Sequence, residues 1–261
     1  PNNTLRNPFE NIFANPIATL NETLNKSATI RFLGTGYAEY EIIKGLKAKV
    51  LLGTDISNDK EKYYVPSIIY EGAGTNGQAS LGNSTTYSWL NENTFSWSKE
   101  FGKSALTALA GFTQQESANE RFTAGAQQFV TDDLTYNNLE SGSVLLRPTS
   151  GTYDWVLHSY LSRITYNYNS LYYLTASIRR DGSSRFGKNN KWGNFPSVSA
   201  AWNISKENFF TPLRDKVSDL KLRASFGTTG NLEIGQYQSL ATLYSLNYLF
   251  GGNIISGFAP Q

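Results

Sequence analysis

The sequence predicts an all-β protein, an antiparallel transmembrane β-barrel segment of about eight strands, and three observations favour it. Apolar and polar residues alternate with a period of two, the strand period. Short and long connections follow one another in turn along the chain. Aromatic residues make up 14% of the chain, and many lie beside the short connections. Period two alone also fits a soluble β-sandwich. The alternation of connections therefore favours the barrel, with short turns on the periplasmic side and long loops outside.

The composition excludes several classes of protein. The 261 residues carry a net charge of +2, which predicts no nucleic-acid partner. There is no cysteine, so disulfide scaffolds and cysteine zinc sites are excluded. The single histidine, His158, excludes any site that needs two. Nothing in the sequence indicates catalysis, and we expect no enzyme activity, no metal and no cofactor.

The clearest hairpin spans residues 36–52. A three-residue loop at 43–45 aligns Glu41 with Lys47 and places apolar residues opposite one another on the other face. Gly45 then falls where such a loop needs a left-handed residue. A slip of one residue would destroy both matches, so the sequence predicts this register.

Further segments with the same alternation follow along the chain. One hairpin turns at 168–170, and its predicted register sets Ile164 against Leu174 and Ser162 against Ala176. The two strands of this hairpin are expected at 155–167 and 171–180. Further strands are expected at 87–99, 104–112, 197–205 and 220–228.

The connections complete the expected organisation. Residues 1–26 are an irregular lead-in, and 27–261 form the barrel segment. By parity, 206–218 is a periplasmic link with one helical turn. The expected outer loops lie at about 57–85, 114–153, 181–194 and 229–261.

Charged residues on one face of the strands are the candidate lumen lining, because alternate residues of a barrel strand face lipid and lumen. The residues predicted to face the lumen are Glu39, Glu41, Lys47, Lys49, Arg163, Arg179, Lys221 and Arg223.

Three other patterns resemble functional motifs but lack the context that function requires. Residues 72–77 read G-x-G-x-x-G, but no amphipathic helix follows to cradle a phosphate, so a flexible outer loop is expected. His158 lies on a predicted strand without a nucleophile elbow, and an ordinary strand histidine is expected. The acidic residues Asp132 and Asp133, and Asp55 with its neighbours Asp59 and Glu61, lack calcium-loop spacing and are expected to be solvated loop carboxylates.

One stretch, residues 179–196, interleaves basic and aromatic side chains. Such residues could pack a loop against the barrel rim, stack on the sugar rings of a glycan or contact a peptide. Binding of single-stranded nucleic acid is disfavoured by the near-neutral net charge. The candidate residues for contact with a substrate or a lid protein are Arg185, Phe186, Lys188, Lys191 and Trp192.

The same stretch carries a family resemblance. Residues 174–202, with the run Arg-Arg-Asp-Gly-Ser-Ser-Arg-Phe-Gly at 179–187, resemble the barrel hallmark of the SusC/RagA family. Residues 219–231 resemble the next family motif, and the segments around Arg31, Tyr40 and Asp132 are similar to others. The resemblance covers nearly the whole chain.

The resemblance implies a TonB-linked transporter of the bacterial outer membrane that takes up large nutrients, typically glycans or peptides. Its implied partners are outer-membrane lipid, a SusD-like surface lipoprotein that acts as a lid, and TonB, which energises a plug. The family barrel is a plugged type of about 22 strands, so the chain is expected to be a mid-barrel segment. The alternatives are a passive porin or small outer-membrane barrel, and a soluble β-sandwich module that binds glycans.

Overall fold

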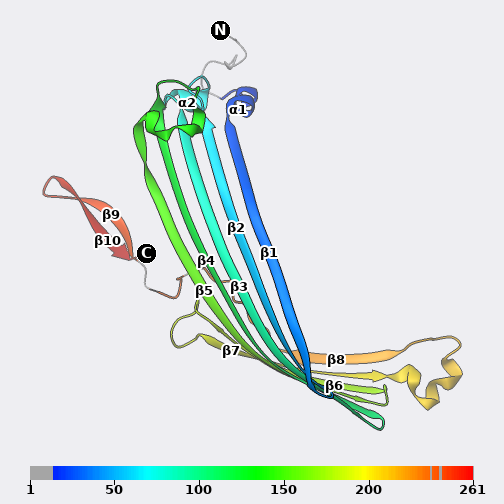
Figure 1. Ribbon diagram of the computed structural model, residues 1–261. Helices are drawn as coiled ribbons and strands as arrows, with labels where there is room; N and C mark the ends of the chain where they lie inside the picture. Colours follow the sequence, from blue (N-terminus) through cyan, green and yellow to red (C-terminus); the bar gives the residue numbers. More distant parts are fainter. Residues whose placement is uncertain (1–13, 236, 241–242, 261) are drawn as a thin grey trace. The chain divides into compact units, whose positions relative to one another are not determined.

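The computed structural model describes residues 14–235, 237–240 and 243–260. Two short helices, α1 (Pro16–Glu22) and α2 (Tyr70–Ala73), accompany ten strands (Figure 1). The strands are β1 (Leu24–Ile43), β2 (Leu46–Val65), β3 (Gln78–Phe101), β4 (Ser104–Phe129), β5 (Gly142–Tyr168), β6 (Tyr172–Ser183), β7 (Trp192–Asn203), β8 (Lys221–Gly227), β9 (Leu243–Phe250) and β10 (Asn253–Pro260). The 3-10 turns are η2 (Thr135–Asn137), η3 (Leu139–Ser141), η4 (Ile204–Lys206) and η5 (Asn208–Leu213).

Strands β1 to β8 form one sheet, in which each strand pairs with its neighbours in sequence. A sandwich would divide the strands between two packed sheets, so this order rules out the sandwich alternative. Within the described residues β1 and β8 are the two ends of the order, so this chain does not form a closed eight-stranded barrel. No helix among those residues is long and apolar enough to cross a membrane.

The predicted strands are confirmed, but the register of the hairpin β5–β6 differs from the prediction by two residues. Tyr168 pairs with Tyr172 and Ile164 with Ala176, so the turn lies at 169–171. Asn169 and Ser170 both have positive φ, at 52° and 54°. These are the backbone conformations of a type I′ turn, which centres the loop one residue later than predicted. Because the shift is two residues, every side chain keeps its predicted face.

The predicted faces of the hairpin β1–β2 are confirmed by its contacts. Lys47 bonds to Glu39 at 3.0 Å, and the ammonium group of Lys49 lies 4.8 Å from the ring centre of Tyr37. Gly45 has a φ of 84°, the left-handed conformation expected of it. All four contacting residues are odd-numbered, so they share one face of the two strands.

The first five strands, β1 to β5, are much longer than predicted. Strands β1 to β5 have 20 to 27 residues, whereas about 9–11 residues cross a membrane. Most of 57–85 and 114–153 is therefore strand, and 184–191 replaces the predicted loop 181–194. Polar residues outnumber apolar ones in most of these segments, so no regular alternation marked them. Their side chains bond between strands instead, as Asn58 does to Asn83 at 3.2 Å and to Thr85 at 2.7 Å.

The chain divides into two compact units, and unit 1 comprises the described part of Pro1–Gly34 with Thr54–Ser88 and Ala118–Tyr153. In unit 1, α1, α2 and the β4–β5 connection lie at the same end of the strands (Figure 1). One core there packs Tyr64 and Ala79 against Ala126, Phe129 and Tyr136. A second joins Ala18 of α1 to Val65 and Ile69. We call this end, with the connections 66–77 and 130–141, the loop cap. Helix α1 corrects the expectation of an irregular lead-in, while residues 1–13 lie outside the described residues.

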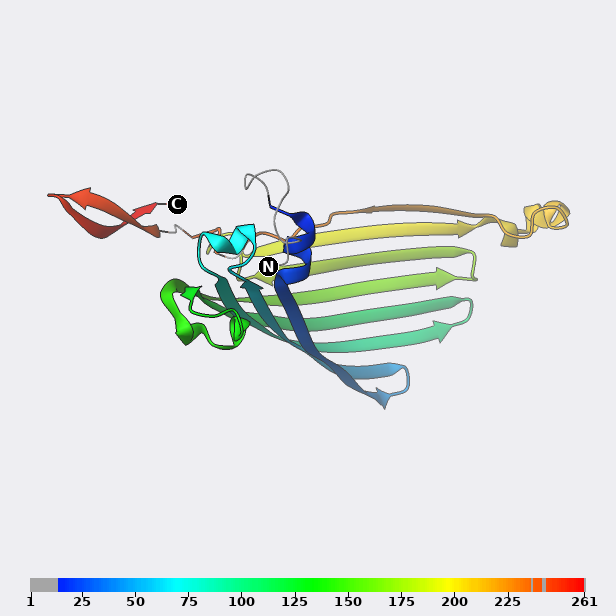
Figure 2. The ribbon, with the colours of Figure 1, turned by 90° about the horizontal axis from the view of Figure 1, so that it is seen from above.

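Unit 2 comprises Thr35–Gly53, Trp89–Ser117 and the described part of Asp154–Gln261. The tight turns of unit 2 lie together at one end of its strands (Figure 2). At this end Tyr172 stacks on Trp202, with ring centres 6.4 Å apart, and Phe209 packs edge-on against Trp202. The Tyr172 hydroxyl and the Trp202 Nε1 both donate to the carboxylate of Glu207. The link that carries Glu207 contains the 3-10 turns η4 and η5, in line with the helical turn expected there.

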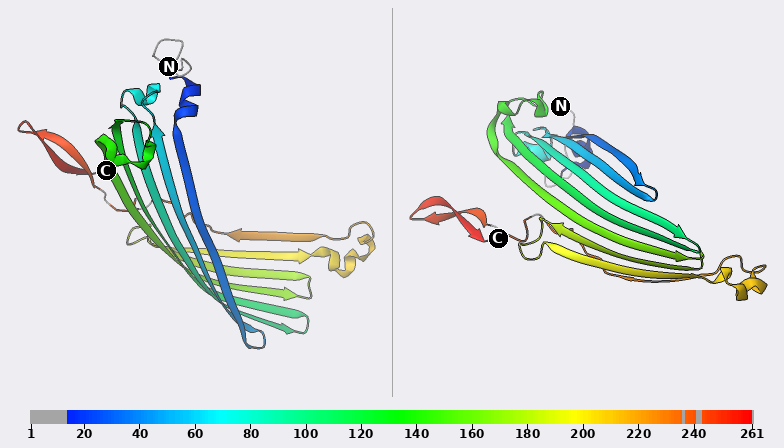
Figure 3. Two further views of the ribbon diagram at one scale, coloured as in Figure 1. Left: turned by 45° about the horizontal axis from the view of Figure 1, so that its top comes forward. Right: turned by 60° about the horizontal axis from the view of Figure 1, so that its bottom comes forward.

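The last described segment is a hairpin and not only a loop. Strands β9 and β10 pair from Leu243 with Pro260 to Phe250 with Asn253 (Figure 3). Gly251 and Gly252 both have positive φ and form the two-residue turn. The predicted outer loop 229–261 is therefore corrected in its second half. The segment has no charged residue after Glu233, so the charge alternation that marked the other hairpins was absent.

Candidate lumen surface and outer loops

In unit 2 the charged residues of β1 and β2 are held by local contacts. Glu39 accepts a hydrogen bond from Lys47, and the carboxylate of Glu41 accepts the backbone N–H of Gly45 at 2.7 Å. These groups are exposed to solvent, so the Lys47–Glu39 pair contributes little to stability. The structure places the predicted residues Glu39, Glu41, Lys47 and Lys49 on one face, and their exposure to the lumen stays a prediction.

In unit 1 the acidic residues of β2 are strand residues, which corrects the expectation of solvated loop carboxylates. Asp55 receives two bonds from the guanidinium group of Arg31, at 2.8 and 2.6 Å. Asp59 accepts from the hydroxyls of Thr29 and Ser57. Both acids therefore hold the β1–β2 pair together across strands. Glu61 is an exposed residue of the same strand.

The cationic residues of β5, β6 and β8 share one face. Arg163 pairs with Ser177, Ser177 pairs with Ser197, and Ser197 pairs with Gly227. Arg179 lies two residues further along β6, and Arg223 and Lys221 lie on the same face of β8 because they pair with Ala201 and Asn203. The other face of these strands carries apolar side chains that are about half exposed or more: Tyr160, Ile164, Leu174, Ile178, Val198, Leu222 and Phe226.

This cationic face contains a groove of about 640 Å³. Hydroxyl groups line much of it, among them Ser177, Ser197 and Ser225, and Arg163 and Arg179 lie at its side. Arg179 is already engaged, because its Nε donates to both oxygens of Asp181 at 2.7 and 2.9 Å. Arg163 has no ion pair within the described part of the chain. The groove therefore offers one free guanidinium group and a row of hydroxyls, which suits a polar ligand.

A third cation of this face, Lys221, lies 4.0 Å above the ring of Tyr173. Arg223, two residues along β8, has no ion pair with any described residue. All four predicted cations of this region thus occupy one face, and their position in the lumen stays a prediction.

The basic and aromatic stretch divides into two groups. The guanidinium group of Arg185 stacks 4.7 Å from the ring of Trp155, and its Nη1 donates to the carbonyl of Leu232 at 3.1 Å. Trp192 stacks on Tyr160, with ring centres 6.0 Å apart. These two residues pack against neighbouring strands and loops, as the rim-packing interpretation expects.

The other three candidate contact residues lie on the 184–191 connection. Lys188 and Lys191 are exposed, and Phe186 is half-buried. The two lysines can therefore meet another molecule, and Trp192 also leaves 44% of its surface exposed.

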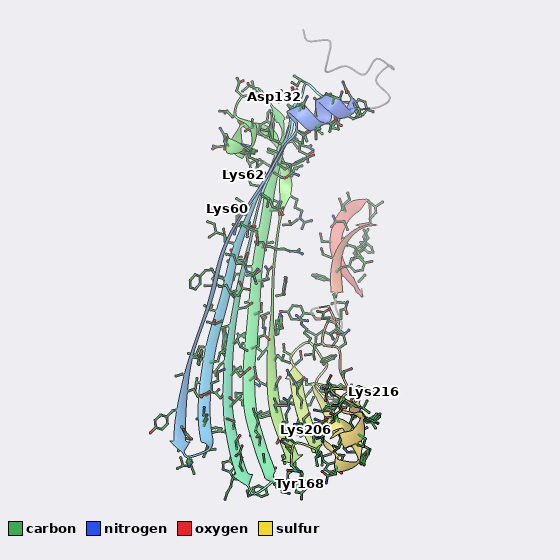
Figure 4. All side chains as sticks on the ribbon, turned by 90° about the vertical axis from the view of Figure 1, so that its right-hand side faces the viewer. Lys60, Lys62, Asp132, Tyr168, Lys206 and Lys216 are labelled. Atoms are coloured by element: carbon green, nitrogen blue, oxygen red, sulfur yellow. The ribbon has the colours of Figure 1, made fainter. Side chains whose placement is uncertain are left out.

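The loop cap is held by Asp132, which corrects the expectation of a solvated loop carboxylate. Its carboxylate accepts the Tyr64 hydroxyl, the backbone N–H of Ser67 at 3.0 Å and the Ser67 hydroxyl at 2.7 Å. Figure 4 shows Asp132 in the loop at the α1 end of the strands. Burial raises the pKa of Asp132, but the hydrogen bonds from Tyr64 and Ser67 outweigh burial and leave the pKa below its ordinary value. Burial and the adjacent Asp132 together raise the pKa of Tyr64.

The glycine motif 72–77 belongs to the same cap and is ordered by packing. A Cβ on Gly72 would collide with the carbonyl oxygen of Pro66, and Gly77 has a φ of 82°. The expectation of a flexible loop is therefore wrong, because these glycines fit a tight turn that is bonded to β4 through Gln128 and Phe129.

His158 lies on β5, as expected, beside the ring of Phe112 at 5.9 Å. Its buried Nε2 has no hydrogen-bond partner among the residues that the structure describes. Over the same residues, no group of three or more histidine, aspartate and glutamate side chains could hold a metal ion.

Comparison with known proteins gives several matches to TonB-dependent receptors. The chain is 38% identical over 245 residues to TonB-dependent receptor P3 of Formosa agariphila, covering 93% of this chain and 24% of that protein. It is 37% identical over 250 residues to receptor P39 of the same organism, covering 94% of this chain and 23% of that one. TonB-dependent receptor SusC of Bacteroides thetaiotaomicron is 28% identical over 256 residues, with 95% and 25% covered. No family model matches the chain.

Among solved structures, the RagAB peptide transporter superposes with a TM-score of 0.83 at 28% identity, covering 94% of this chain and 27% of that one. A structure of the RagAB peptide importer in the closed-closed state gives a TM-score of 0.82, with the same identity and coverage. The chain therefore spans about a quarter of the length of the relatives it matches.

The fold and these matches define part of a strand-built TonB-dependent barrel of the bacterial outer membrane. The chain is a barrel segment of the SusC/RagA family, which confirms the resemblance seen in the sequence.

Proposed function

We propose that the parent protein imports large nutrients, oligosaccharides or peptides, across the outer membrane with energy supplied through TonB. The observation that carries the proposal is the match of 94% of this chain to the RagAB peptide transporter at a TM-score of 0.83. The relatives are receptors and transporters by name, which supports import over enzyme activity.

Within such an importer this chain supplies wall, lumen lining and outer loops. The face with Arg163, Arg179, Lys221 and Arg223 lines the lumen, and the apolar face with Ile164 and Leu222 meets lipid, since a barrel strand must present one face to each. The groove of about 640 Å³ with its serine hydroxyls supports passage of a polar, hydrogen-bonding substrate.

A surface lipoprotein of the SusD type is the proposed lid over the outer loops. Lys188 and Lys191 support contact with the lid or the substrate, because they are exposed at the connection between β6 and β7. Reversing both charges, Lys188→Glu with Lys191→Glu, is expected to weaken co-purification of the lipoprotein or growth on the substrate. The matched control is Lys44→Glu with Lys103→Glu at the tight turns, which should change neither.

The experiment that tests import is growth on single nutrient sources. A strain without the parent gene is grown on a panel of oligosaccharides and peptides, and the gene is then restored as wild type or as Arg163→Ser with Arg223→Ser. We expect a growth defect on one nutrient class, full restoration by wild type and slower uptake with the double variant. Unchanged growth of the deletion strain on every nutrient would contradict the proposal, and a defect across all small solutes would favour a passive porin.

A further inference from the structure

We propose that the outward face of unit 1 binds the anionic, sugar-bearing headgroups of outer-leaflet glycolipids, through Lys26, Lys60 and Lys62 and the neighbouring groove. This inference rests on the barrel orientation of the proposed function, because it requires the face with these lysines to point away from the lumen.

The face assignment follows from cross-strand contacts within unit 1. Thr29 bonds to Asp59 and Arg31 to Asp55, so odd-numbered residues of β1 and β2 share one face. The even-numbered residues, Lys26 with Lys60 and Lys62, therefore share the opposite face. Thr29 and Asp59 are neighbours across the two antiparallel strands. Lys26 lies three residues before Thr29, and Lys60 and Lys62 lie one and three residues after Asp59, so the three lysines are neighbours as well. Figure 4 shows Lys60 and Lys62 following one another along the strand near the loop with Asp132.

These lysines stand directly above an apolar surface. Ile30 and Phe32 lie on the same face of β1 as Lys26 and are 73% and 60% exposed. Four residues separate Ile30 from Lys26, about 13 Å along a strand. A tilted strand that has its apolar side chains in the hydrocarbon therefore places these ammonium groups at headgroup level.

The three cations lack an acidic partner within the described residues. None of the ion pairs there includes Lys26, Lys60 or Lys62, and the ammonium group of Lys62 lies 5.3 Å from the ring centre of Tyr136. Like charges on facing strands destabilise a sheet. A bound anion removes this repulsion, and phosphate groups at a membrane surface are anions of the required kind.

The adjacent strands present groups suited to sugars. Asn58 bonds to Asn83 and Thr85, so these residues of β3 share the face of the lysines. On the other face of the sheet, Asn119 of β4 bonds to Ser84 and Thr86 of β3. The neighbouring even-numbered residues of β4, Glu120 and Phe122, therefore lie on the same face as Thr85. A groove of about 390 Å³ lies over these strands, and Asn83, Thr85, Glu120, Phe122, Ser150 and Thr152 are among the residues that line it.

The chemistry of this groove favours a glycolipid over a simple phospholipid. Phe122 is 54% exposed and offers an apolar face to a sugar ring. The amide and hydroxyl groups of Asn83, Thr85, Ser150 and Thr152 can exchange hydrogen bonds with sugar hydroxyls, and the Glu120 carboxylate accepts from them. The lysines then hold the anionic group of the same headgroup.

The test uses the full-length parent protein purified from outer membranes, and mass spectrometry measures the phosphorylated glycolipid that it retains. The variant K26Q/K60Q/K62Q is expected to retain less, by about fivefold for each lysine lost. The variant K26R/K60R/K62R should retain the wild-type amount, as should the control K44Q/K103Q/K206Q, whose lysines lie at the tight turns and the link. Retention by K26Q/K60Q/K62Q equal to wild type would overturn the proposal.

A second measurement separates the sources of the anion. The detergent-solubilised protein is titrated with vesicles that contain phosphorylated glycolipid, with vesicles that contain phosphatidylglycerol, and with inorganic phosphate. Preference for the glycolipid vesicles, reduced by Phe122→Ala, supports the proposal. Equal binding to phosphatidylglycerol, or binding of inorganic phosphate alone, contradicts it. Growth of the same strains on the imported nutrient is measured separately, so loss of import and loss of lipid binding are distinguished.

Discussion

At the scale of single residues, Asp132 joins two connections that are 65 residues apart in sequence, through both the backbone and the hydroxyl of Ser67. The same carboxylate accepts the hydroxyl of Tyr64, which belongs to the cap core. An ionised carboxylate with three donors is a strong acceptor. Asp132 therefore holds the 66–77 connection and the 130–141 connection together.

Replacement of Asp132 should loosen the loop cap without disturbing the strands. Asp132→Asn weakens three hydrogen bonds to a charged acceptor, so we expect a local loss of about 1–3 kcal/mol. Amide hydrogen exchange in the parent protein should speed up in residues 66–77 and 130–141. The control is Asp133→Asn, since the Asp133 carboxylate bonds only to the hydroxyl of Thr131 among the described contacts. Equal exchange rates in the two variants would contradict the assignment.

The same carboxylate predicts the pH dependence of the cap. The pKa of Asp132 is lower in the folded protein than its ordinary value, so the folded state favours the ionised form. Its stabilising contribution is complete above the unfolded pKa of about 3.9 and disappears as the pH falls through the lower folded pKa. Exchange in the cap should therefore be constant from neutral pH to about pH 5, after correction for the intrinsic rate, and rise below pH 4. Asp132→Asn should abolish this rise.

Two glycines of the 72–77 motif give a matched pair. Gly72→Ala places a Cβ against the carbonyl of Pro66, whereas Gly74→Ala meets no atom within 4 Å. We expect overpacking of about 1–3 kcal/mol at Gly72 and little change at Gly74. Limited proteolysis of the parent protein should cut within 66–77 in the first variant only. A phosphate-binding loop would instead lose ligand affinity in both variants.

At the scale of elements, the sequence predicted the strands that have one apolar face and missed the strand extensions that lack one. Residues 36–52 alternate charged with apolar side chains, so both the hairpin and its faces could be predicted. Residues 57–65 and 114–129 are mostly polar without a regular alternation, and their strand conformation depends on bonds to partners distant in sequence, such as Gln127 to Gln78. The sequence of one segment does not indicate which distant strand it pairs with.

The same reasoning explains the candidate site. The predicted cations at 163, 179, 221 and 223 share a face because strand parity is a local property that survives a register shift of two. The bonds of Asp132 could not be predicted, because they join three elements through turns whose geometry depends on packing. To predict the contact between Asp132 and the 66–77 connection, the packing of the cap core would have to be known first.

The face assignment predicts opposite effects at adjacent positions of β7. Val198 is 47% exposed on the apolar face, and Ser199 faces Thr175 and Ser225 on the cationic face. Val198→Lys in the parent should cost roughly 2–4 kcal/mol near the bilayer midplane and reduce barrel assembly, while Ser199→Lys should be tolerated. Heat-modifiable migration in gels measures assembly. Spin labels at 198 and 199 provide a second readout, and a water-accessible label at 198 with a lipid-accessible one at 199 would reverse the assignment.

At the scale of the whole chain, the described sheet has two ends, β1 and β8, that pair with one neighbour each. Unpaired backbone groups at such edges cost several kcal/mol each in hydrocarbon, which is why membrane-spanning sheets close into barrels. The segment corresponds to about a quarter of the length of its relatives. The rest of a wider barrel would supply the partners of β1 and β8.

Residues 1–261 expressed alone are therefore expected not to form a stable barrel. In detergent the edges of β1 and β8 stay open, and closure of eight strands would force the charged face with Arg163 and Glu39 into a narrow interior that side chains must fill. In water the apolar face with Ile164, Leu222 and Phe226 would be an exposed patch large enough to drive aggregation. Refolding into detergent, followed by proteolysis and by migration of heated and unheated samples, measures the outcome. A compact, protease-resistant, heat-modifiable monomer would show that eight strands suffice, whereas the same assay on the full-length parent should give the heat-modifiable form.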